Sequence, residues 1–181
     1  TTANNGAVRI NNAGTLTIDN GANFNLDGAF AQVSTVGTGS VSLGGNITTT
    51  NDAIGFAKAV TLTNNVLMNT NIAGGSITFS ETLNSDTTAA RTLGLTAGDG
   101  NIDFDGIVGG TTPLGAVTIN SAEDVTADDA FSAASLSQVA GSGTTTFTGA
   151  LTTTAAEGIN VDGTNFDFNN TVSLTLGDLD V

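Results

Sequence analysis

Short triplets of apolar, polar and apolar residues recur along this chain, each bounded by residues that favour turns. Alternation with a period of two over three to five residues predicts a short strand with one buried face and one solvated face. Apart from Leu67, the middle positions hold Thr, Ser, Asn, Asp, Gly or Arg, which suits a solvated outer face. The triplets predict strands at Val8–Ile10, Leu16–Ile18, Phe24–Leu26, Val41–Leu43, Val60–Leu62, Val66–Met68, Ile77–Phe79, Leu93–Leu95, Ile102–Phe104, Val117–Ile119, Ile159–Val161, Phe166–Phe168 and Leu174–Leu176.

Asn, Asp and Gly stand between the triplets, where they tolerate left-handed backbone conformations and turn the chain sharply. Only residues 127–140 could form a helix, and the apolar positions Phe131, Leu136 and Val139 fit strand and turn equally well. The predicted turns lie at Asn11–Asn12, Asn20–Gly21, Asp27–Gly28, Gly44–Asn46, Asn64–Asn65, Gly74–Gly75, Gly109–Gly110, Asp162–Gly163 and Asn169–Asn170.

Many short strands with close turns are typical of either an antiparallel sandwich or barrel, or a parallel solenoid. Internal repetition favours the solenoid. Residues 43–50 resemble residues 147–154, and residues 60–66 resemble residues 166–172. A shorter echo sets residues 77–79 against 102–104 and residues 93–95 against 117–119. The spacing of this echo, 24 to 25 positions, is about one turn of a three-faced solenoid.

We therefore predict an all-β fold over residues 1–181, a single right-handed parallel β-helix (β-solenoid) segment with roughly 20–25 residues per coil. At about 22 residues per coil and ~4.8 Å between strands, the chain would make about eight coils and a rod of about 40 Å. The pattern shows no capping helix at either end, so the terminal coils would leave open edges. The side chains expected to stack inside are Leu62, Phe79, Leu95, Phe104, Ile119, Phe147 and Phe168.

Composition limits the function classes. The 181 residues are 39% hydrophobic and only 11% charged, with a net charge of −14 and no Cys, His, Trp or Tyr. Arg9, Lys58 and Arg91 are the only basic residues, so repulsion from phosphates excludes a nucleic-acid partner and disfavours an anionic membrane surface. No apolar run of about 18 residues is present, so no membrane insertion is expected.

Three runs, residues 77–79, 98–104 and 114–120, resemble the repeats of large bacterial surface proteins, the filamentous-haemagglutinin-like and autotransporter-like β-helix passengers. The resemblance covers most of the chain from about Val41 onward and is one of style rather than of an invariant motif. It implies export, a surface-anchored or released fibre, and adhesion or matrix formation. It implies no catalytic residues.

The densest acidic stretch runs from Asp99 to Asp105. Its Asn101-x-Asp103-x-Asp105-Gly106 pattern matches the opening of a calcium loop, but Thr112 stands where that loop needs Glu. Ile102 and Phe104 instead fit the inward positions of a strand. An outward-facing acidic strand is the preferred interpretation.

Two other features have simple structural interpretations. Asp128-Asp129 resembles the paired carboxylates of β-helix enzymes that cleave glycosides, but the His and the Arg/Lys pair that such enzymes add are absent. The Thr runs at residues 48–50, 144–146 and 152–154 resemble ice-binding solenoids, although the variable loops favour plain β-propensity.

The sequence thus predicts a secreted, extracellular structural or adhesive rod of a bacterial surface protein or fibre. No enzyme activity, catalytic residue, cofactor or metal site is expected. The alternative is a carbohydrate-active β-helix enzyme domain. The chain has neither an initial Met nor a basic leader, which fits an excerpt of a longer repetitive chain. We expect end-to-end self-association or continuation within such a chain, and an adhesive partner among receptors or glycans of host or neighbouring cells.

Overall fold

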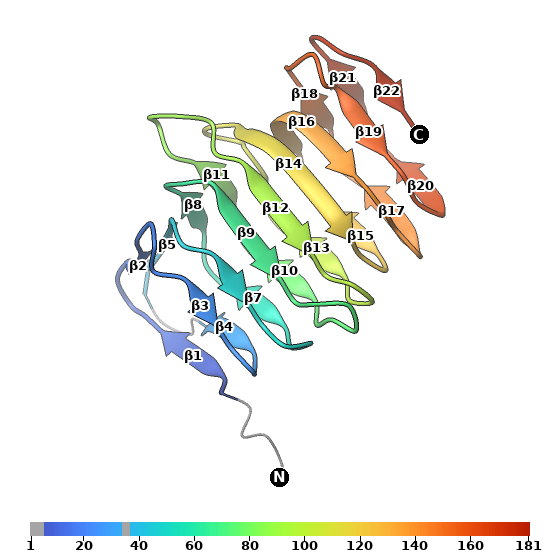
Figure 1. The fold of residues 1–181 in the computed structure, drawn as a ribbon. Coiled ribbons are helices and arrows are strands. Elements are labelled where there is room, and N and C mark those ends of the chain that lie inside the picture. The colour runs from blue at the N-terminus through green and yellow to red at the C-terminus, as the bar shows by residue number, and fades with distance from the viewer. Residues whose placement is uncertain (1–5, 34–36) are drawn as a thin grey trace.

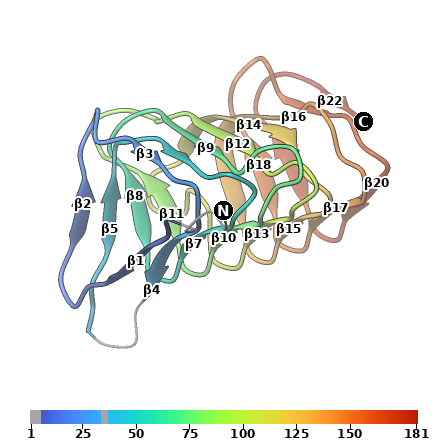
Figure 2. The same ribbon diagram turned by 60° about the horizontal axis from the view of Figure 1, so that its bottom comes forward.

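The computed structural model describes residues 6–33 and 37–181, and in them the chain is a parallel β-solenoid of about seven turns with about 23 residues per coil. All strand pairings among the described residues are parallel, and none of these residues lies in a helix. Seen from the N-terminal end, the chain passes clockwise through the first three strands as it recedes, so the winding is right-handed (Figures 1 and 2). The predicted fold class is confirmed, while residues 1–5 and 34–36 of the predicted segment lie outside the described residues.

Eight strands form the sheet along one side of the solenoid (Figure 1). Register partners in this sheet stand 20 positions apart from Val125 to Thr145 and 25 apart from Ile77 to Ile102, within the predicted coil length. The strands are β1 (Val8–Asn11), β4 (Phe30–Val33), β7 (Ile54–Phe56), β10 (Ile77–Phe79), β13 (Ile102–Phe104), β15 (Val125–Ala127), β17 (Thr144–Phe147) and β20 (Asn165–Phe168).

The other two sides hold a four-stranded and a ten-stranded sheet (Figure 2). The four strands are β2 (Leu16–Ile18), β5 (Val41–Leu43), β8 (Val60–Leu62) and β11 (Leu83–Ser85). The ten are β3 (Phe24–Asn25), β6 (Ile47–Thr48), β9 (Val66–Asn69), β12 (Leu93–Thr96), β14 (Leu114–Ser121), β16 (Phe131–Gln138), β18 (Leu151–Thr153), β19 (Ile159–Val161), β21 (Val172–Leu174) and β22 (Leu179–Asp180). Because β16 pairs with both β18 and β19, one long strand covers two strands of the following coil.

The shorter sequence echo marks coil-to-coil equivalence. Residues 77–79 pair directly with 102–104, and residues 93–95 pair with 117–119. The two longer resemblances, of residues 43–50 to 147–154 and of residues 60–66 to 166–172, do not mark equivalent positions on successive coils. Leu43 ends a strand of the four-stranded sheet while Phe147 ends one of the eight-stranded sheet, and β8 and β20 likewise belong to different sheets. Those stretches share a strand–turn–strand pattern at different corners of the coil.

A column of phenylalanine rings occupies the interior. Neighbouring ring centroids are 5.3 to 5.9 Å apart from Phe24 at one end to Phe168 at the other, a spacing at which aromatic pairs attract one another. The predicted inward residues are confirmed, six of them being at most 2% exposed, whereas Phe168 in the last coil is only half-buried. The column comprises Phe24, Phe30, Phe56, Phe79, Phe104, Phe131, Phe147 and Phe168.

The structure decides one open alternative and corrects one predicted strand. Residues 127–140, where a helix was an option, form the end of β15 and all of β16, because Phe131, Ala133 and Leu136 each stack on the next coil. The predicted strand Leu174–Leu176 lies two residues too far along the chain. The strand there is β21, which stacks on β18, and Leu176 is 57% exposed.

The backbone agrees with the predicted turns at Asn20–Gly21 and Gly109–Gly110. Gly21 and Gly109 have φ angles of 88° and 69°, the left-handed region that side chains with a Cβ rarely adopt. A Cβ on Gly109 would also collide with the Ser132 carbonyl of the next coil. Close coil contact at this corner therefore requires glycine.

Candidate functional site

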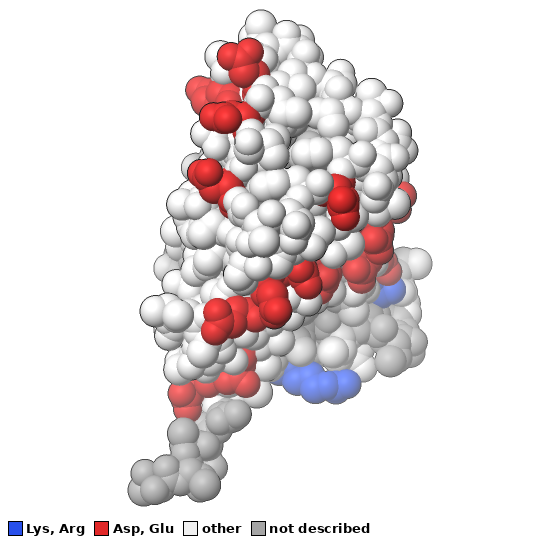
Figure 3. Space-filling view, turned by 90° about the vertical axis from the view of Figure 1, so that its right-hand side faces the viewer, with Lys and Arg blue, Asp and Glu red and all other residues white. Residues whose placement is uncertain are grey.

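Acidic side chains gather in a band across one face of the rod (Figure 3). Its centre is Asp103, the outward residue of β13, whose register partners on the neighbouring strands are Thr78 and Thr126. Partial burial raises the pKa of Asp103, and the charges of Asp105, Asp128 and Asp124 raise it further, while a hydrogen bond with Thr78 lowers it. Four carboxylates from two adjacent coils therefore share one electrostatic environment, which we call the acidic band.

Within the stretch from Asp99 to Asp105, residues Ile102–Phe104 form strand β13, and Asp99 lies in the turn that precedes it. Ile102 and Phe104 point into the core and are at most 1% exposed, so Asp103 points outward between them. Asn101 is already engaged, since its Oδ1 accepts a hydrogen bond from the backbone N–H of Asp124, at 3.2 Å. The interpretation as an outward-facing acidic strand is confirmed for Ile102–Phe104, where Asp103 faces outward. Within residues 6–33 and 37–181, no group of three or more acidic residues is placed to hold a metal ion.

Asp128 and Asp129 occupy the exposed turn between β15 and β16. Two of the chain's three basic side chains are engaged elsewhere. The Lys58 Nζ lies 3.6 Å from Glu81, and the Arg91 Nη2 lies 2.8 Å from Asp86. The pair at 128–129 is therefore a solvated acidic turn that contributes Asp128 to the acidic band.

The Asp86–Arg91 contact closes the loop between β11 and β12. The Asp86 carboxylate accepts hydrogen bonds from Nε and Nη2 of Arg91, from the hydroxyl and N–H of Thr88, and from the N–H of Ala89. This cluster, led by the Arg91 guanidinium, holds the pKa of Asp86 well below its usual range. Because every partner lies within the loop, we assign the cluster a structural role.

Corner asparagines and one corner aspartate tie successive coils together. The Asn23 Oδ1 accepts from the N–H of Asn46, and the Asn46 Oδ1 accepts from the N–H of Leu67, both at 2.8 Å. At another corner the Asp124 carboxylate accepts from the N–H of Thr144, at 2.7 Å. These side chains satisfy backbone donors where the strands end. These side-chain hydrogen bonds therefore hold successive coils against one another.

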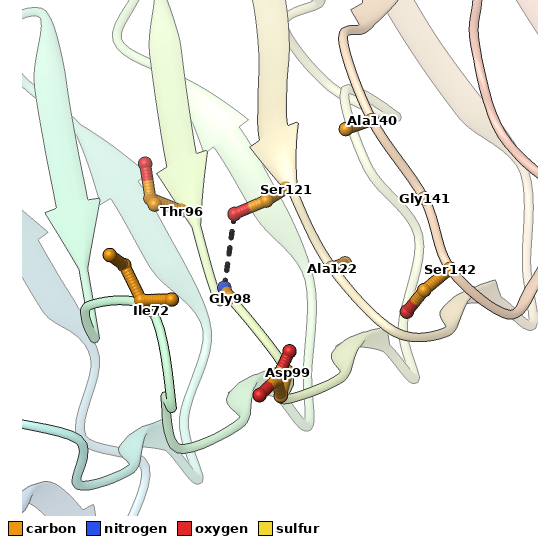
Figure 4. Close-up of a pocket in the computed structure, with 9 residues that line it drawn as sticks. All are labelled: Ile72, Thr96, Gly98, Asp99, Ser121, Ala122, Ala140, Gly141 and Ser142. Carbon is orange, nitrogen blue, oxygen red and sulfur yellow. Dashed lines mark hydrogen bonds between the residues drawn. The ribbon is translucent and has the colours of Figure 1, made fainter.

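A shallow groove, which the sequence did not predict, lies where β12 and β14 end (Figure 4). Ile72, 80% exposed, stands at one side, and Ser142 stands at the other. Across the middle, the Gly98 N–H donates to the Ser121 Oγ at 3.1 Å, and Asp99 is the only charged lining residue. The only signal in the sequence was an apolar residue, Ile72, that lies outside the strand triplets and directly follows Asn71. Because the lining residues are mostly small and include a single carboxylate, the groove is a contact surface rather than a set of converging catalytic groups.

Comparison of the chain with protein-family models, with curated proteins and with solved structures finds no match. Among the described residues, no helix is long and apolar enough to cross a membrane. The functional argument therefore depends on the fold and on the surfaces described above.

Proposed function

We propose that the chain is an extracellular structural and adhesive rod of a bacterial surface protein or fibre, without catalytic activity of its own. The observation that carries the proposal is the column of stacked rings running through the solenoid, with parallel sheets on three sides. Each coil extends the rod by one strand spacing and buries its inner side chains against its neighbours. Such a fold gives length and stiffness without enclosing a deep site.

The outer faces support an adhesive role. From β10 to β17 the outward positions of the eight-stranded sheet hold Thr78, Asp103, Thr126 and Thr146, in direct register. Rows of hydroxyl groups on a flat sheet present many weak donors and acceptors at a regular spacing, and many weak contacts together give avidity. Receptors and glycans of other cells are partners of that chemistry.

Two measurements test this proposal. Antibodies raised against the chain should label intact cells of the source organism without permeabilisation. Beads coated with the chain should be retained on cultured host cells more than beads coated with an acidic globular protein of equal net charge. A matched variant, Asp103→Asn with Asp105→Asn and Asp128→Asn, separates contact through the acidic band from contact through the hydroxyl rows. Internal labelling only, with no bead retention, would overturn the proposal.

The acidic band is the one feature that supports the alternative function, a carbohydrate-active enzyme domain, because paired carboxylates can protonate a leaving oxygen and activate water. Release of reducing sugar from a panel of polysaccharides distinguishes the two functions. The rod proposal expects no release, whereas release that Asp128→Asn abolishes would replace it with the enzyme.

A further inference from the structure

The two end coils present apolar faces. Leu179 and Val181 in the last coil are 45% and 62% exposed, and other inner residues of both end coils are only half-buried. Within the described chain, β1 pairs only with β4, and β20 pairs only with β17, so each has one unpaired edge. The half-buried inner residues are Val8, Ile10, Leu16, Phe24 and Leu26 at the N-terminal end and Phe166, Phe168, Val172 and Leu174 at the C-terminal end.

The register of the eight-stranded sheet determines what would lie on the C-terminal face if the stacking continued. Val8 and Phe166 belong to one continuous row of register partners, and Ile10 and Phe168 belong to the next inward row. A β1 strand added beside β20 in the same register therefore places Val8 on Phe166 and Ile10 on Phe168. Apolar residues meet apolar residues along the whole new strand pair.

The other two sides give the same answer independently. One row runs from Leu16 to Val172, so the added coil sets Leu16 on Val172 and Ile18 on Leu174. Another row runs from Phe24 through Leu95 and Gln138 to Val161, which the pairing of β19 with β22 continues to Val181. The exposed Val181 would then be covered by Phe24.

Charge agrees with this register. Arg9 is the outward residue of β1, and the row that starts at Arg9 ends at Asp167, the outward residue of β20. Between them the row holds Ala31, Gly55, Thr78, Asp103, Thr126 and Thr146. The continued stacking therefore places a guanidinium beside a carboxylate at neighbouring positions on parallel strands, where opposite charges attract.

A second polar match lies at the corner that holds Asn23. Successive coils there join when a side-chain oxygen accepts the N–H of the next coil, as Asn23 accepts from Asn46. The corner row that begins at Asn23 ends at Asp180. An added coil would therefore set the Asn23 N–H over the Asp180 carboxylate, the same kind of contact between coils.

We propose that the C-terminal face of one copy binds the N-terminal face of a second copy, head to tail, with β1 adding to β20 in register and Arg9 pairing with Asp167. Between copies of the 181-residue chain, such a contact joins two different surfaces and leaves one of each free at the ends of the oligomer, so it builds a filament rather than a closed dimer. The inference extends the proposed rod by naming the partner of its ends, and it depends on the proposed function only for the rod itself.

Sedimentation velocity on the 181-residue chain over a range of concentrations tests the association. The expected result is a growing series of head-to-tail oligomers. Arg9→Asp and Asp167→Arg should each weaken the association constant at least tenfold, and the double variant, which keeps the net charge of −14, should restore it. Asp162→Arg, in the exposed turn after β19, changes the charge as Asp167→Arg does but lies outside the proposed contact, so it should not weaken association. Both substituted residues, Arg9 and Asp167, are exposed, and circular dichroism checks that each variant is folded.

Disulfide trapping tests the register, and the chain has no cysteine of its own. Cysteines at neighbouring positions of paired parallel strands come close enough to bond. A mixture of the Arg9→Cys and Asp167→Cys proteins should form a crosslinked heterodimer, whereas Arg9→Cys with Asn169→Cys, two positions out of register, should not. A monomer at all concentrations, equal weakening without rescue in the double variant, or preferred crosslinking out of register would overturn the inference. Any of these results would leave the labelling and bead assays of the proposed function unaffected.

Discussion

The central coils bury their inner side chains almost completely, whereas the inner side chains of the last coil are only half-buried. Ile102 and Phe104 are at most 1% exposed, while Phe166 and Phe168, which occupy the same two rows, are only half-buried. The alternation of residues is the same in both regions. The difference shows that a coil has no core of its own, because its neighbours on both sides complete the burial.

The ring column shows how the central coils keep that burial where the row of aromatic residues is interrupted. Ala127 stands in register between Phe104 and Phe147, and Phe131 from the next strand supplies the missing ring, 5.4 Å from Phe104 and 5.6 Å from Phe147. Gln32 interrupts the row at the other end, where Phe30 contributes the ring 5.5 Å from Phe56. A phenylalanine ring therefore fills the interior of these coils even where it comes from a different register position.

Emptying the column should have the largest effect. Phe104→Ala should lower the free energy of unfolding by about 3–5 kcal/mol, because it removes a buried ring with a neighbour on both sides. Phe168→Ala, with one described ring neighbour, should cost only about 1–2 kcal/mol. Urea denaturation followed by circular dichroism measures both. Equal losses would contradict the difference between central and terminal coils.

Two substitutions can move the ring that Phe131 supplies to position 127, in register with Phe104 and Phe147. Phe131→Ala alone should cost about 3–5 kcal/mol, and Ala127→Phe alone about 1–3 kcal/mol through overpacking. The double variant should cost less than the sum of the two by roughly 1–3 kcal/mol, because the new ring fills the vacated space. A double-mutant cycle in urea gives the coupling. Additive losses would show that the two positions do not share one cavity.

The strands that the sequence predicted are those with two strong apolar residues flanking a polar one. Most of the missed strands have weaker patterns, although β7, in which Ile54 and Phe56 flank Gly55, has the same pattern and was missed. β11 ends in the buried Ser85, and β18 ends in the buried Thr153, whose Oγ1 has no hydrogen-bond partner. A polar residue at an inward position breaks the alternation that identifies a strand, so only stacking on the neighbouring coil shows its direction.

Buried glutamines explain another part of what could not be predicted. Gln32 is satisfied by Asn12 and by the N–H of Ala57, from the coils on either side. Gln138 is satisfied by the hydroxyl of Thr145 and by the carbonyl of Asp162. Each depends on partners 7 to 25 positions away in the sequence, so local periodicity carries no signal for it. The acidic band was only partly visible for the same reason, since stacking alone brings Asp124 and Asp128 to Asp103.

A smaller effect is expected in the loop closed by Asp86. Because the pKa of Asp86 is lowered in the folded chain, the ionised form stabilises the fold above the ordinary carboxyl range, and that contribution is lost as the pH falls below about 4. Asp86→Asn should lower the melting temperature by at most a few degrees at pH 7, since the contact is near the surface. Below about pH 3 the difference from wild type should shrink. A difference that is constant from pH 7 to pH 3 would mean that the charge on Asp86 is not the cause.

The smallest effect, and of opposite sign, is expected at Asp103. Burial and three neighbouring carboxylates raise its pKa, so the folded chain disfavours its ionised form. Wild-type stability should therefore gain as the pH falls from neutral through the raised pKa of Asp103. Asp103→Asn keeps a group of the same shape that can hydrogen-bond with Thr78 and removes the charge, so it should raise the melting temperature slightly at pH 7. The gain should vanish below about pH 4, where wild-type Asp103 is protonated as well.

Asp162→Asn, an equal change of net charge in the exposed turn after β19, is the matched control and should leave the melting temperature nearly unchanged. Scanning calorimetry of wild type and both variants between pH 7 and pH 3 measures the effect. A lower melting temperature for Asp103→Asn at pH 7 would mean that ionised Asp103 helps hold β13 between its neighbours, and the acidic band would then be a stabilising feature of the rod rather than a strain on it.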